Sequence, residues 1–100
     1  MAEPTDEIRF CKEMTITRKE FLRNLATALP AQSYRVERDK ISIESPSRQI
    51  VIALNDQHQR RIGSLQLPRM RVDFSFSGYS QAEAESFMRH IDIHFRRGGG

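Results

Sequence analysis

The sequence predicts an α+β domain in two layers: a helix, four or five antiparallel strands and a second helix, with both helices on one face of the sheet. Three observations lead to this prediction. Apolar residues recur at helical spacing near each end of the chain and at a spacing of two through its middle. Both helical patterns begin at a capping box. The connections are short, which favours strands that follow one another across one sheet.

The first 13 residues are expected to form a flexible segment. Ile8 and Phe10 alternate there with charged residues, which is typical of either a frayed tail or a short edge strand. A tail that docks partly through these two side chains is the favoured interpretation. One ordered domain is then expected over residues 14–97, followed by a glycine tail at 98–100, and no internal repeat or domain boundary is evident.

The first helix has a complete start signal. Thr17 and Glu20 have the spacing of a capping box, and Ile16 and Phe21 that of a hydrophobic staple. Pro30 is expected to end the helix. One apolar stripe follows the cap, formed by Phe21, Leu22, Leu25, Ala28 and Leu29.

The middle of the chain is predicted to be a sheet. Alternating or continuous apolar runs occur in the segments 34–37, 41–44, 49–54, 61–67 and 70–76. Residues 49–54 are apolar on both faces, which predicts a central strand covered on both sides. Gly63 is a candidate bulge and Pro68 a break. Turns are expected at Asp39-Lys40 and Ser45-Pro46-Ser47.

The second helix starts at another capping box, Ser80 with Glu83. Ile93 falls on the side opposite to the apolar stripe, and Gly98-Gly99-Gly100 are expected to end the helix. The stripe consists of Ala84, Phe87, Met88, Ile91 and Phe95.

Composition restricts the class of protein. The chain has 100 residues, a net charge of +3 and a single cysteine, Cys11, which excludes an internal disulfide. No apolar run approaches the roughly 20 residues of a membrane span. The polar start, Met1 to Pro4, shows no secretory signal. A cytoplasmic protein is therefore expected.

Three segments near the C-terminal end resemble a group of short, uncharacterised bacterial proteins that end in a helix and an Arg-Gly-Gly-Gly tail. These segments are residues 61–68, 74–80 and 95–100. The resemblance implies a bacterial origin and no activity. The order helix, strands, helix is also similar to one half of the TATA-binding protein, in architecture alone, and fold analogy does not carry function.

No catalytic or metal site is expected. His90 and His94 have a spacing that places two imidazoles on one side of a helix, but no further ligand is evident. A nucleophilic Cys11 needs a base and a lowered pKa; Lys12 and Arg9 are near it in sequence, but no structured pocket is indicated there. The tail resembles the double-glycine end of ubiquitin-like carriers, yet those need a helix between two hairpins. We therefore expect a non-enzymatic protein without a cofactor.

A protein that binds RNA on the face of its sheet needs exposed aromatic side chains there, on which the bases stack. Tyr34, Phe74 and Phe76 instead share the alternation of Val36 and Val72, which are expected to be buried. These aromatic residues are therefore expected in the core.

Three functions remain as hypotheses. The favoured one is an interaction domain, a homodimer through the second face or an edge of the sheet, because Val51 and Ala53 add apolar area to that face. The remaining residues of this face are expected to be Arg35, Glu37, Ser42, Glu44, Arg71, Asp73 and Ser75.

The first alternative is a nucleic-acid accessory protein, with arginines that contact phosphates. Its candidate contacts are Arg60, Arg61, Arg69, Arg71 and Arg97.

The second alternative is a small-molecule module. A ligand would lie between the helices and the sheet, near Met70, Met88 and Phe87, in a pocket larger than roughly 300 Å³.

Overall fold

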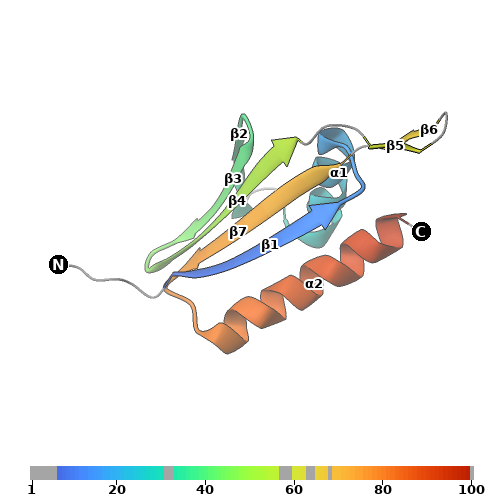
Figure 1. The fold of residues 1–100 in the computed structure, drawn as a ribbon. Helices are drawn as coiled ribbons and strands as arrows, with labels where there is room; N and C mark the ends of the chain where they lie inside the picture. The colour runs from blue at the N-terminus through green and yellow to red at the C-terminus, as the bar shows by residue number, and fades with distance from the viewer. Residues whose placement is uncertain (1–6, 31–32, 57–59, 63–64, 68, 100) are drawn as a thin grey trace.

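The computed structural model describes residues 7–30, 33–56, 60–62, 65–67 and 69–99, with side chains described for 7–30, 33–55 and 69–95. It confirms the predicted fold class: two helices and a five-stranded antiparallel sheet (Figure 1). The elements in chain order are β1 (Ile8–Met14), α1 (Arg18–Ala28), β2 (Arg35–Glu37), β3 (Lys40–Ser45), β4 (Arg48–Asp56), β5 (Arg60–Ile62), β6 (Leu65–Leu67), β7 (Met70–Ser77) and α2 (Gln81–Gly99).

The main sheet has the order β1-β7-β4-β3-β2, and all of its pairings are antiparallel. The strands β2, β3 and β4 are joined by tight turns, as the sequence predicts. β4 lies at the centre and pairs with β7 over eight residue pairs, from Gln49 with Ser77 to Asp56 with Met70. The segment 49–54 is thus a central strand, as predicted, but it is not covered on both sides: both helices lie over Ile50 and Ile52, and no described element covers Val51 and Ala53.

The N-terminal segment differs from the expectation of a flexible tail. Residues 8–14 form the edge strand β1, which pairs with β7 without a bulge from Ile8 with Phe76 to Met14 with Met70. The pairing places Ile8 and Phe10 beside buried residues of β7, where both side chains pack against the core. β4 pairs with only one edge of β7, so the other edge is available to β1. The alternation of Ile8 and Phe10 is therefore that of an edge strand and not of a tail.

The segment 61–67 is not a strand of the main sheet, contrary to expectation. β5 and β6 pair only with each other, and Figure 1 shows them as a hairpin that projects beyond one end of the sheet. The reason is that β4 and β1 already occupy both edges of β7. The sequence predicts a bulge at Gly63 and a break at Pro68, but both residues lie outside the described ones.

One core lies between the sheet and the two helices. α1 contributes Phe21 and Leu25 to it, and α2 contributes Ala84, Met88 and Ile91. The sheet contributes one face only, made of Ile41, Ile50, Ile52, Leu54, Met70, Val72, Phe74 and Phe76. Both helices therefore cover the same face, as predicted, and the helices contact each other.

Val36 does not share the burial expected for it. Its side chain is 40% exposed. It lies on the three-residue edge strand β2, at the far end of the sheet order from β1. Tyr34 is half-buried against the core, and Phe74 and Phe76 are fully buried, so no aromatic side chain of these three forms an exposed stacking platform.

Both predicted capping boxes are confirmed. The Glu20 amide donates to the Thr17 hydroxyl at 3.1 Å, and the Thr17 amide donates to the Glu20 carboxylate at 3.0 Å. Ser80 and Glu83 repeat the arrangement at 3.1 and 2.9 Å. α1 ends before Pro30, as expected. α2 continues to Gly99, so two glycines expected in the tail belong to the helix.

Within the described part of the chain, neither helix combines the length and the apolar character needed to cross a membrane.

Candidate functional site

The face of the sheet opposite the helices has no layer over it among the described residues, and we call it the open face. Its central row runs across all five strands through register partners: Arg9 on β1, Ser75 on β7, Val51 on β4, Ser42 on β3 and Arg35 on β2. The three middle residues of this row are half-buried although no element covers them. The centre of the open face is therefore small, uncharged and partly apolar.

The second row of the open face lies beside this centre and carries Ala53 between two charged residues. It contains Cys11, Asp73, Ala53 and Lys40 as successive register partners. Ala53, like Val51, is half-buried. The structure thus brings together the two residues predicted for an interface, on adjacent rows of the central strand.

Charges surround this centre in equal numbers. Each of β1, β2, β3 and β7 contributes one basic and one acidic side chain to the open face, and β4 contributes none. These pairs are Arg9 with Glu13, Arg35 with Glu37, Lys40 with Glu44, and Arg71 with Asp73. The described strands of the open face therefore carry no net charge.

The arginines predicted to bind phosphate are not gathered into one described cluster. Arg69 forms an ion pair with Glu13, and Arg71 lies 3.4 Å from the Asp73 carboxylate. The backbones of Arg60, Arg61 and Arg97 are described, in β5 and α2, whereas their side chains lie outside the described ones. The two described arginines are thus partly neutralised by acidic neighbours.

Cys11 lies exposed on the open face, beside Asp73. A hydrogen bond to the Asp73 carboxylate, together with partial desolvation and the negative charge of Asp73, raises the pKa of the Cys11 thiol above its ordinary 9.0. A thiol of this kind is a weak nucleophile at neutral pH, because the thiolate is the reacting form. The environment of Cys11 is thus opposite to that of a catalytic cysteine.

The two histidines of α2 lie with their ring centroids 4.5 Å apart. One ring nitrogen of each is already occupied: His90 Nε2 lies 2.8 Å from the Ala28 carbonyl oxygen, and His94 Nδ1 lies 3.0 Å from the His90 carbonyl oxygen. Among the described residues, no group of three metal-ligating side chains occurs. His90 instead connects α2 to the C-terminal end of α1.

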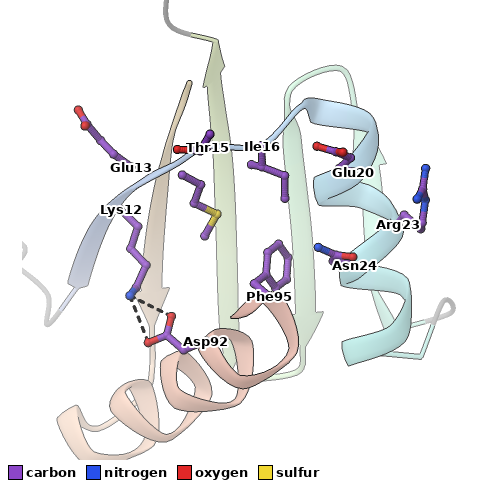
Figure 2. A pocket seen from close by; sticks show the side chains of 10 residues that line it. Lys12, Glu13, Thr15, Ile16, Glu20, Arg23, Asn24, Asp92 and Phe95 are labelled. Atoms are coloured by element: carbon purple, nitrogen blue, oxygen red, sulfur yellow. Dashed lines mark hydrogen bonds and ion pairs between the residues drawn. The ribbon is translucent and has the colours of Figure 1, made fainter. Parts of the chain in front are cut away.

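A cleft of about 660 Å³ opens on the helix side of the molecule, where β1, α1 and α2 converge. Figure 2 shows Phe95 rising from α2 beneath Ile16, with Asn24 on one side of it. On the other side, Lys12 of β1 reaches down to Asp92 of α2, at 2.9 and 3.2 Å from its two carboxylate oxygens (Figure 2).

The cleft does not lie where the sequence predicts a ligand. Met70 and Met88 are buried in the core, at 1% and 4% exposure. The ring of Phe87 packs edge-on against Phe76, with centroids 5.5 Å apart. None of these three lines the cleft. One feature of the sequence could have indicated a residue of the cleft. Lys12 lies two residues after Phe10 and four after Ile8, so in a strand its side chain faces the same side as theirs, toward the helices.

No family model, no curated protein and no solved structure matches this chain. The resemblance to short bacterial proteins stays an expectation.

Proposed function

We propose that the chain is a non-enzymatic interaction domain that pairs with a second copy of itself through the open face. The observation that supports this proposal is the half-buried, apolar pair Val51 and Ala53 on the long central strand. Val51 lies between the uncharged Ser42 and Ser75, and balanced charges surround this centre. Protein interfaces have this anatomy, with charge depleted at the core and a polar rim.

The face is favoured over the edges because both edges are protected against strand addition. β2 is only three residues long. On β1, Lys12 faces the helix side, and its side chain is about one-third exposed where it pairs with Asp92. A strand added next to β1 would enclose this charge further, and inward-pointing charges on edge strands are a known protection against pairing.

The charge balance favours a protein partner over a nucleic acid. A phosphate backbone requires a surplus of cations on the contacted surface. The open face instead offers as many acidic as basic side chains, so a second copy can meet each sign with the opposite one. A symmetric pair also uses one patch twice, which a single short chain can supply.

The size of the face indicates a moderate affinity. Five strands about 4.8 Å apart, with about six residues each at roughly 3.3 Å per residue, give a face of roughly 24 by 20 Å. Each copy would bury roughly 400–600 Å², so the total lies near the ~1,000 Å² expected of a specific interface. We expect a dissociation constant on the order of 1–100 µM.

Sedimentation velocity between about 1 and 200 µM tests the proposal. The wild type should change from monomer to dimer, and Val51→Arg should stay monomeric, because it places a charge at the uncharged centre. Ile93→Arg is the matched control, since Ile93 is 55% exposed on the outer side of α2. A wild type that is monomeric throughout contradicts the proposal, and a dimer that only Ile93→Arg disrupts places the interface on α2.

Cys11 supplies an independent reporter, because it is the only thiol and lies on the open face. Alkylation at high protein concentration should be slower than at low concentration, and Val51→Arg should remove that difference. An alkylation rate that is independent of concentration across the sedimentation transition contradicts an interface at this face. Binding of generic DNA or RNA that weakens steeply with salt would favour the arginine hypothesis instead.

A further inference from the structure

The cleft between β1, α1 and α2 has the size of a ligand site. Its volume of about 660 Å³ falls within the roughly 300–1,000 Å³ typical of small-molecule pockets. It lies on the helix side of the sheet, since Lys12 shares the face of Phe10 and Met14, and Glu13 of the open face borders it only at the end of β1. A ligand beside Lys12 and Asp92 and a second copy over Val51 would therefore contact different faces of the sheet.

The floor of the cleft is apolar and only half-covered. Met14, Ile16 and Phe95 line it, and each packs partly against the core while keeping exposed surface. Asn24 points from α1 toward Phe95 (Figure 2). Its side-chain amide makes no hydrogen bond to any other described residue. The cleft thus combines an apolar surface with an amide that has both donor and acceptor capacity left for a ligand.

The wall of the cleft is an ion pair. Lys12 and Asp92 are each about one-third exposed, at 34% and 37%, so both charges remain reachable from solvent. The remaining charged groups of the lining are directed elsewhere. Glu20 closes the capping box with Thr17, Glu13 pairs with Arg69, and Arg23 points outward (Figure 2). One positive and one negative group are therefore left facing the apolar floor.

We propose that this cleft binds a small zwitterion that carries an apolar side chain, the chemistry of an aromatic or branched-chain amino acid. The ligand carboxylate contacts the Lys12 ammonium, the ligand ammonium contacts the Asp92 carboxylate, and the apolar group lies against Phe95. An aromatic ring gains most there, because edge-on and offset contacts between rings add to the burial of apolar surface.

The paired wall selects against ligands with one charge. An anion would be attracted by Lys12 but repelled by Asp92. A cation would be attracted by Asp92 but repelled by Lys12. A zwitterion replaces one ion pair by two and leaves no charge without a partner, which is the condition for partly desolvated charges to be favourable.

Titration of the isotope-labelled protein with phenylalanine, followed by NMR, tests this proposal. For a ligand of this size we expect a dissociation constant on the order of 1 mM, with the largest shifts at the amides of Lys12, Asn24, Asp92 and Phe95. The matched analogues are 3-phenylpropionate, which keeps only the anion, and phenethylamine, which keeps only the cation. Each should bind about fivefold more weakly or worse, as should glycine, which lacks the apolar group.

The variant Asp92→Asn separates recognition from folding. It should weaken phenylalanine about fivefold and strengthen 3-phenylpropionate, because the repulsive carboxylate is gone. A folding defect would weaken both. Glu85→Gln, the same change at an exposed position of α2 outside the cleft, should alter neither.

The proposal is overturned by the absence of saturable shifts up to about 20 mM, roughly twentyfold above the expected constant. It is also overturned by analogues that bind as well as phenylalanine, or by unchanged binding in Asp92→Asn. Binding should persist in the monomeric Val51→Arg variant, so the outcome for the cleft is independent of the outcome for the dimer.

Discussion

Gly78 joins β7 to α2 and is the position where we expect a single methyl group to cost most. Its φ is +83°, in the left-handed region that side chains rarely adopt. A Cβ built there would lie less than 3.0 Å from the carbonyl oxygen of Ser47 and 3.3 Å from the Cα of Arg48. Both neighbours are backbone atoms, one in the β3–β4 turn and the other at the first residue of β4, so neither can move aside as a flexible side chain would.

The cost of Gly78→Ala follows from these two features. The left-handed conformation of an L-residue costs roughly 1–2 kcal/mol, and forced contact in a packed site adds roughly 1–3 kcal/mol. Alanine also lowers the conformational entropy of the unfolded chain, which stabilises the folded state by less than about 1 kcal/mol and offsets part of this cost. We therefore expect a loss of about 3 kcal/mol, which lowers the Tm of a domain of this length by roughly 12–24 °C.

Urea and thermal denaturation, followed by circular dichroism, measure this loss. Gly78→Asn keeps the crowded Cβ but tolerates a positive φ, so it should lose less than Gly78→Ala and more than about 1 kcal/mol. Ser77→Ala, at the exposed neighbouring position, should stay within about 0.5 kcal/mol of the wild type. A Gly78→Ala variant as stable as the wild type would refute the reasoning, and a fully stable Gly78→Asn would refute the backbone contact.

Three further predictions concern the turn, the second helix and the thiol. Arg38 has a φ of 55° in the β2–β3 turn, so Arg38→Gly should raise the free energy of unfolding by about 0.5–1 kcal/mol in urea titrations, and a loss would contradict this strain. The Ser80 amide lowers the pKa of Glu83 below its usual 4.5. The charged Glu83 therefore stabilises the fold above pH 4.5, and the advantage of the wild type over Glu83→Gln should shrink as pH falls below that value. An advantage that does not shrink at all between about pH 5 and pH 3 contradicts this. The raised pKa of Cys11 predicts slow alkylation near pH 8, measured on dilute protein, which Asp73→Asn should accelerate; equal rates would exclude Asp73 as the cause.

The two helices could be predicted from sequence because their signals are local. A capping box needs two residues three positions apart, and Thr17 with Glu20 and Ser80 with Glu83 meet that condition in the structure. The apolar stripes also depend only on spacing, and they place Phe21 and Ile91 in the core as expected. The placement of Val51 and Ala53 on the face away from the helices also followed from spacing, because successive residues of one strand point to opposite faces.

The alternation of apolar and polar residues thus determined which segments extend and which side of each is apolar, because a strand places successive side chains on opposite faces whatever its neighbour is. Only the tertiary structure decided which strands are neighbours. Residues 8–14 and 61–67 have comparable patterns, yet the first occupies the free edge of β7 and the second pairs within its own hairpin. Which segment joins the main sheet depends on which strand edge is still unpaired, and that edge belongs to a strand far away in the sequence. The cleft depends on it as well, since Lys12 reaches Asp92, 80 residues away, only when β1 lies beside β7.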